Sequence, residues 1–163
     1  MRSRSRCALV GALVALALSC GRRHDQEEGG YALHVEDLLR DDCGLLRGSG
    51  ELYQAELRLS GHSVQLRAQP LPGATGDFRQ YEMLLVGAYL SGLEEFRVDG
   101  SASNVTSVLP SGRECLLDQV TLHVDAITDT PTTFHGTLSV RYEARSSDPC
   151  SCELWAHFRA EKL

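Results

Sequence analysis

Apolar and polar residues alternate with a period of two along most of this chain, and this pattern constrains its fold more than any other feature. The alternation runs through residues 51–59, 64–68, 96–102, 120–126, 134–144 and 150–160. In the clearest segment, Phe134, Leu138 and Tyr142 share one face while Thr137 and Arg141 share the other. Such a pattern is typical of β-strands with one buried face. No segment of helical length shows a helical period, so the sequence predicts an all-β fold.

Short clusters of turn-forming residues separate these segments. They lie at residues 60–62, 70–76, 91–92, 109–112, 128–132 and 147–149. Residues 31–38 give a weaker first strand. Residues 81–90 are apolar on both faces, which favours a strand buried on both sides; a short helix is the alternative, and Gly87 argues against it. The sequence thus predicts a single antiparallel up-and-down meander of about eight strands. This meander forms either a small barrel or a two-layer sandwich, and the short connections favour the barrel.

The first twenty residues have the order of an export signal. Arg2, Arg4 and Arg6 form a basic opening, residues 7–18 form an apolar run, and Ser19 precedes Cys20. The apolar run is too short to cross a hydrocarbon core of about 30 Å as a helix, so a cleaved signal is a better interpretation than a permanent membrane span.

Ala17-Leu18-Ser19-Cys20 resembles the lipobox of bacterial lipoproteins, in which small and apolar residues precede a cysteine. The resemblance implies that Cys20 receives a lipid on its sulfur and becomes the N-terminal residue after cleavage. Gly21, where such lipoproteins carry Asp for inner-membrane retention, implies the outer membrane, facing the periplasm. The alternative is an ordinary cleaved signal in which Cys20 is incidental.

The remaining chain divides into a tether and one domain. Residues 21–30 contain no apolar residue to bury, which predicts a flexible tether reaching about 30 Å. We therefore expect a signal peptide over residues 1–19, the lipidated cysteine and tether over residues 20–30, and a single antiparallel β domain over residues 31–163.

The charge balance argues against a nucleic-acid partner. The chain carries 22 Asp and Glu against 16 Lys and Arg. Three of the arginines fall within the export signal, and no basic stripe is present elsewhere. An acidic surface repels phosphate backbones.

Four cysteines remain after the signal and Cys20 are set aside, namely Cys43, Cys115, Cys150 and Cys152. In an oxidising compartment outside the inner membrane they predict two disulfides, with a zinc site as the competing interpretation. Odd strands of a meander end where even strands begin, so all four cysteines are expected at one end of the molecule. If the sheet closes, Cys43 pairs with Cys150 or Cys152, and Cys115 pairs with the other.

Histidines on predicted outward faces give the strongest candidate for chemistry. A symmetric hairpin sets Asp125 opposite His135 and His123 opposite Thr137, and the last hairpin sets His157 opposite Thr137. This arrangement is too spread for a metal centre. The sequence also lacks a Gly-x-Ser-x-Gly elbow, a HExxH pair and a phosphate-binding glycine loop. We therefore expect no catalytic residue, no metal and no cofactor.

In outline the predicted barrel is similar to lipocalin-like bacterial lipoproteins, a resemblance that implies an apolar ligand held in the interior or at its mouth. The expected function is a non-enzymatic binding or interaction module. Its partner, a small apolar ligand or a protein, is expected in an apolar pocket bounded by Leu45, Leu46, Leu71, Val108 and Leu109. The alternatives are a metal-dependent envelope enzyme that uses the outward histidines, and a purely structural envelope protein. Trp155 falls on a polar face and is expected to pack under a loop.

Overall fold

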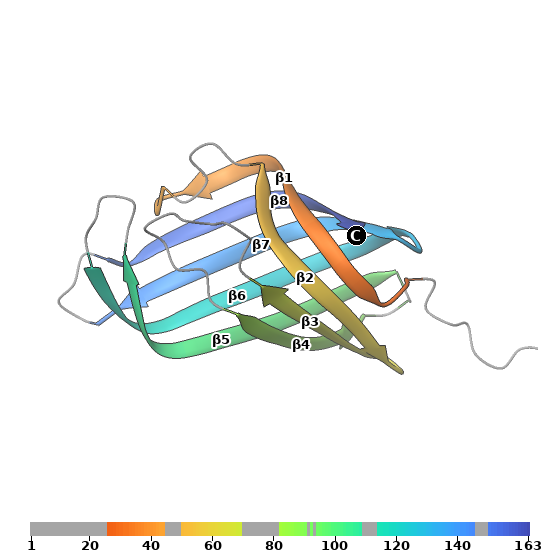
Figure 1. The fold of residues 1–163 in the computed structure, drawn as a ribbon, viewed down its shortest axis with the longest axis horizontal. Coiled ribbons are helices and arrows are strands. Elements are labelled where there is room, and N and C mark those ends of the chain that lie inside the picture. The colour runs from red at the N-terminus through yellow and green to blue at the C-terminus, as the bar shows by residue number, and fades with distance from the viewer. Residues whose placement is uncertain are drawn as a thin grey trace, which may run out of the picture.

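A computed structural model describes residues 26–44, 50–69, 82–90, 92, 94–108, 114–145 and 150–163, with the backbone alone at residues 51, 52, 107 and 108. The predicted signal peptide and Cys20 lie outside these residues. Eight antiparallel strands form a closed barrel in which each strand pairs with its neighbours in sequence and β1 pairs with β8 (Figure 1). The strands are β1 (Gly29–Asp41), β2 (Glu51–Ser60), β3 (Ser63–Gln69), β4 (Met83–Tyr89), β5 (Glu95–Val108), β6 (Glu114–Thr130), β7 (Thr133–Ala144) and β8 (Cys152–Lys162). The structure confirms the predicted all-β meander and settles barrel against sandwich.

The barrel has two different ends. The connections from β2 to β3, β4 to β5 and β6 to β7 form one end, which we call the short-turn end. The connections from β1 to β2, β3 to β4, β5 to β6 and β7 to β8 leave from the opposite end, which we call the loop end. No described residue belongs to a helix long and apolar enough to cross a membrane.

Apolar side chains fill the barrel towards the short-turn end. Tyr31, Phe96, Phe134 and Phe158 are buried, and neighbouring rings among them have centroids 5.1–6.0 Å apart. An eight-stranded barrel is just wide enough for side chains to fill its interior. This part of the barrel is therefore a packed core.

The strands of the barrel differ in length. β6 has 17 residues and β5 has 14, whereas β3 and β4 have 7 each. The β4–β5 register runs only from Val86↔Asp99 to Tyr89↔Phe96. The long strands β5 to β8 and β1 thus extend past β3 and β4, as Figure 1 shows.

The prediction that residues 81–90 are buried on both faces is wrong. Met83, Leu85 and Tyr89 point inward and are buried, but Leu84 and Val86 point outward and are each 48% exposed. A closed barrel has a single interior, and among the described residues no second layer covers the outside of β4. Periodicity showed that both faces are apolar, but it carried no information on what covers each face.

The end of the predicted tether packs against the barrel. β1 begins at Gly29, before the predicted domain start at Tyr31. Gln26 is buried, and its Nε2 donates hydrogen bonds to Tyr31 Oη at 2.6 Å and to the Pro131 carbonyl at 3.1 Å. The Glu27 N–H also donates to the Pro131 carbonyl, at 2.7 Å. The chain therefore enters the barrel at the short-turn end, beside the β6–β7 turn.

Candidate functional site

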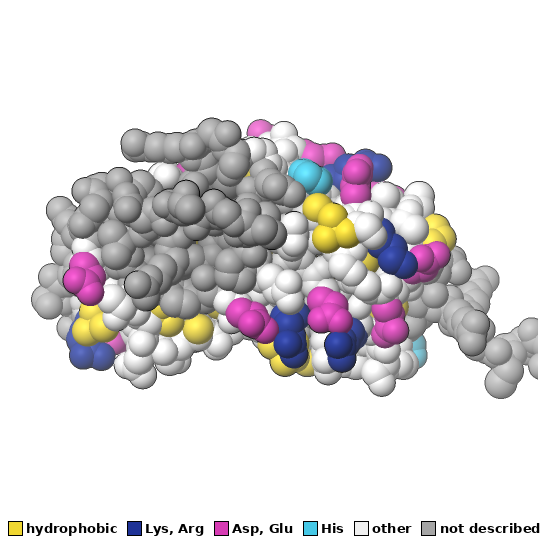
Figure 2. Space-filling view, viewed as in Figure 1, with side chains coloured by type: hydrophobic (Ala, Val, Ile, Leu, Met, Phe, Trp, Pro, Cys, Tyr) yellow, Lys and Arg dark blue, Asp and Glu magenta, His cyan; other side chains and the backbone are white. Residues whose placement is uncertain are grey.

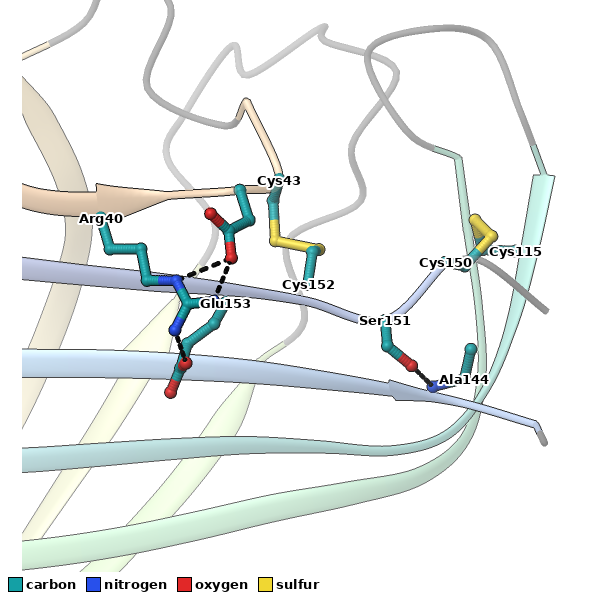
Figure 3. Close-up of a disulfide and its surroundings, with 9 residues drawn as sticks. Arg40, Cys43, Cys115, Ala144, Cys150, Ser151, Cys152 and Glu153 are labelled. Carbon is teal, nitrogen blue, oxygen red and sulfur yellow. Dashed lines mark hydrogen bonds and ion pairs between the residues drawn. A yellow bond between two sulfur atoms is a disulfide. The ribbon is translucent and has the colours of Figure 1, made fainter. Parts of the chain in front are cut away.

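All four cysteines lie at the loop end and form two disulfides, as predicted (Figure 3). Cys43 follows β1 and bonds Cys152 at the start of β8, with a Cα–Cα distance of 5.2 Å. Cys115 lies near the start of β6 and bonds Cys150, with a Cα–Cα distance of 5.8 Å. The two bridges hold the beginning of β8 to the strands β1 and β6.

A charged cluster lies beside the first disulfide. Arg40 donates from Nε to Asp42 Oδ2 at 2.7 Å and from Nη1 to Glu153 Oε2 at 2.8 Å. The Asp42 N–H donates to the Glu153 carbonyl at 3.0 Å, which extends the β1–β8 pairing towards Cys43. Figure 3 shows the guanidinium of Arg40 between the two carboxylates. This cluster fixes the backbone on both sides of the Cys43–Cys152 bridge.

The second disulfide is supported by two further contacts. The Ala144 N–H donates to Ser151 Oγ at 3.0 Å, which joins the end of β7 to the residue between the two β8 cysteines. Arg145 donates from Nε to Asp118 Oδ1 at 2.9 Å, and its N–H donates to the Leu116 carbonyl at 3.3 Å. Each strand end that carries a cysteine is thus held by polar contacts as well as by sulfur.

Two tyrosines lie on the inner wall near the loop end. Tyr53 on β2 and Tyr142 on β7 are both buried, and Tyr142 pairs with Cys152 in the β7–β8 register. Burial raises the pKa of Tyr53 to about 12, and a hydrogen bond with Tyr142 offsets part of this rise. The inner wall around them is apolar, since Val105, Leu117 and Leu154 are buried there. The hydroxyl groups of Tyr53 and Tyr142 are therefore polar groups on an otherwise apolar wall.

The residues expected to bound an apolar pocket, which are Leu45, Leu46, Leu71, Val108 and Leu109, lie outside the described side chains. Among the described residues, a groove of about 500 Å³ lies at the short-turn end, between Glu28 and the last residues of β2. It forms because the β1–β2 pairing ends at Gly29↔Leu57. The Leu59 N–H beyond that pair donates to Glu28 Oε1 at 2.6 Å.

The three outward histidines do not converge on one point. His123 contacts Asp99 through Nδ1 and Asp125 through Nε2, the latter at 2.9 Å. His135 contacts Asp129 at 2.7 Å. The predicted register of His157 opposite Thr137 is confirmed. Among the described residues no group of three His, Cys, Asp or Glu is arranged to hold a metal ion.

The predicted register of the β6–β7 hairpin is wrong. Asp125 lies opposite Thr137, His123 lies opposite Ser139, and His135 lies opposite Ile127. The prediction centred the hairpin on Thr130, whereas the structure places Thr130 opposite Thr133, with an irregularity between Thr128 and Thr130. The shift moves His135 away from Asp125 and towards Asp129.

Trp155 does not pack under a loop as expected. It points outward from β8 between Arg40 on β1 and Ser139 on β7, and it is 45% exposed. The sequence placed it correctly on the polar face, but the face alone does not determine whether another segment covers the ring.

No family model, no curated protein and no solved structure matches this chain.

Proposed function

We propose that this protein is an exported lipoprotein of the bacterial cell envelope, anchored to the outer membrane through an acylated Cys20 and facing the periplasm. In this proposal it acts as a non-enzymatic binding or interaction module through its loop end. The observation that carries the proposal is the separation of the two ends. Gln26 and Glu27 contact Pro131 at the short-turn end, whereas both disulfides lie at the loop end.

This separation supports an outward-facing binding end. An anchor at Cys20 joins the barrel through residue 26, so the short-turn end is the one nearer the bilayer. The loop end then points into the periplasm. Loops held by a rigid scaffold are where binding residues concentrate in proteins, and disulfides reduce the ordering that binding requires.

The described chemistry of the loop end favours a partner with an apolar body and a polar group. The inner wall is apolar around the Tyr53–Tyr142 pair, and the rim carries the charges of Arg40, Asp42 and Glu153. Binding sites of this kind combine an apolar lining with a few placed polar groups that set orientation.

Site-specific photo-crosslinking in cells that export the chain tests this proposal. A photoreactive residue replaces either Glu114, which is exposed at the loop end, or Thr132, which is exposed in the β6–β7 turn at the short-turn end. We expect adducts from position 114 and none from position 132. Adducts from position 132 alone would contradict the assignment of the loop end.

Native mass spectrometry of the purified protein identifies a small ligand directly. We expect a co-purifying mass that is lost when Tyr53 and Tyr142 are both replaced by Phe. If the mass persists in this double variant, the ligand does not use the tyrosine pair.

A further inference from the structure

The outward face of β4 is apolar along its whole length. Leu84, Val86 and Ala88 point outward from the strand and are exposed, and Leu90 just beyond it is 44% exposed. We call these four residues the β4 stripe. The outward faces of the two neighbouring strands carry charges, Arg67 on β3 and Arg97 and Asp99 on β5.

On other described strands the outward faces carry ion pairs, with single apolar side chains such as Leu116, Ile127 and Trp155 also exposed. The outward positions of β2 include Glu56 and Arg58, and those of β8 include Arg159 and Glu161, with ion pairs within each strand. Figure 2 shows basic and acidic side chains interleaved along the lower edge of the described part of one face, where Figure 1 places β2, β3 and β4. Single exposed apolar residues are ordinary, but three on the outward face of β4 followed by Leu90 form a continuous apolar surface, which marks an interaction site.

One flank of the β4 stripe carries Arg67, and the other flank carries both Asp99 and Arg97. Arg67 on β3 pairs with Leu84 in the β3–β4 register, and Asp99 on β5 pairs with Val86 in the β4–β5 register. Arg67 makes a contact of 3.3 Å with Glu82, and Asp99 contacts His123 through Oδ1. A guanidinium has five donors and a carboxylate has two oxygens, so both groups retain capacity for a further partner.

We propose that the β4 stripe is the interface between two copies of this chain. A two-fold axis lying along β4 places the stripe of one copy on the stripe of the other. The same axis brings β3 of each copy over β5 of its partner, so that Arg67 approaches the partner's Asp99 twice. Such an interface uses the same patch on both copies, as in most homodimers.

The size of the surface sets the strength of this pairing. Stable interfaces bury about 800 Å² per partner. An interface made by one strand and its two flanks is at the small end of stable interfaces. We therefore expect a weak dimer that dissociates on dilution. Packed sheets cross at about 30°, so the closest approach falls at the centre of the stripe, at Val86 and Ala88.

Cysteine crosslinking tests the geometry. Under a mild oxidant, Ala88→Cys is expected to give a covalent dimer on a non-reducing gel, because each copy's residue 88 faces its equivalent. Ile127→Cys is the control, since Ile127 is 42% exposed on β6 and lies outside the stripe and away from both disulfides. Equal dimer formation by the two variants, or none by either, overturns the proposal.

Sedimentation equilibrium of the protein purified from exporting cells tests the energetics. The wild-type protein is expected to show a concentration-dependent dimer, and Val86→Lys is expected to weaken the dimer at least tenfold by burying an unpaired charge. Leu116→Lys is expected to leave it unchanged. A monomeric wild-type protein, or equal dimerisation of wild-type and Val86→Lys proteins, overturns the proposal.

A charge exchange tests the orientation of the two copies. Arg67→Glu and Asp99→Lys each weaken the dimer when made alone, because each places like charges opposite one another. The double variant restores opposite charges across the interface and is expected to recover most of the lost affinity. If the double variant is as weak as the sum of the single changes, the proposed pairing is overturned.

Discussion

At the scale of single residues, His123 lies in a polar group on the outer wall with Asp99, Asp125 and Arg97. Partial burial lowers its pKa, but hydrogen bonds and charges from Asp99 and Asp125 raise it by more, so the pKa lies above its usual value. Arg97 contacts the same Asp125 at 2.5 Å. A pKa raised by folding means that the protonated ring stabilises the folded state at low pH, and that this contribution is lost as the pH rises through the raised value.

Replacing His123 with Gln should therefore flatten the pH dependence of stability. The free energy of unfolding of the wild-type protein is expected to exceed that of the variant most at about pH 6, and the excess should shrink as the pH rises past about 6.5. Chemical denaturation of both proteins, at pH values from about 6 to the alkaline range, measures this difference in the free energy of unfolding. His157→Gln is the control, because His157 contacts Thr137 and not a carboxylate. An excess that grows with pH would contradict the assignment.

Gly136 shows how closely two strands approach within the barrel wall. A Cβ at Gly136 would lie 2.0 Å from the carbonyl oxygen of Asp125 on β6, a distance that requires the backbone to move. Gly136→Ala is expected to lower the free energy of unfolding by about 3 kcal/mol. Gly50→Ala has no heavy atom within 4 Å of the new Cβ and should change it by less than about 0.5 kcal/mol. Thermal denaturation of the two variants provides the comparison, and similar melting temperatures would count against this packing.

At the scale of elements, the two disulfides close loops of different length. Cys43 and Cys152 are 109 residues apart, whereas Cys115 and Cys150 are 35 residues apart. Removing a bridge increases the chain entropy of the unfolded state, and the increase grows with loop length. Replacing Cys43 and Cys152 with Ser should cost about 5 kcal/mol, and replacing Cys115 and Cys150 with Ser about 4 kcal/mol. Denaturant unfolding of both double variants gives the order, and a larger cost for the shorter loop would contradict this argument.

Much of the fold was predictable because the period-two pattern and the turn residues determine where strands begin and end. The parity of the strands then placed all four cysteines at one end, since successive antiparallel strands alternate in direction. The choice of Cys152 over Cys150 as the partner of Cys43 was not predictable. Both cysteines lie close to the start of β8, and the choice depends on how far the β1–β8 pairing extends.

Two errors share a physical cause, which is that local pattern does not report long-range contacts. The β4 strand is apolar on both faces. Leu84 and Val86 are nevertheless exposed, because a strand of a closed barrel buries only its inward face. The register of β6 and β7 depends on the two-residue turn at Pro131 and Thr132, and an error in the centre of that turn displaces every cross-strand pair. The sequence predicted which end of the barrel carries the candidate site. The Tyr53–Tyr142 pair was missed, although both residues fall on predicted inward faces.

At the scale of the whole molecule, the barrel has an entry end and a disulfide-stapled end. The contacts of Gln26 and Glu27 with Pro131 place the entry of the chain opposite the sulfur atoms. A chain anchored by its N-terminus would hold the stapled end away from the bilayer. The export signal, the closed barrel and the loop end all fit this orientation. The orientation depends on the proposed acylation of Cys20.

The mass of the mature N-terminal peptide tests that account most directly. Protein is extracted from the membranes of cells that export the chain, digested, and analysed by mass spectrometry. The account predicts a peptide that begins at Cys20 and carries acyl chains, and it predicts that Cys20→Ser abolishes this acylated peptide. An unmodified peptide that begins at another residue would contradict the lipid anchor, and with it the orientation of the barrel.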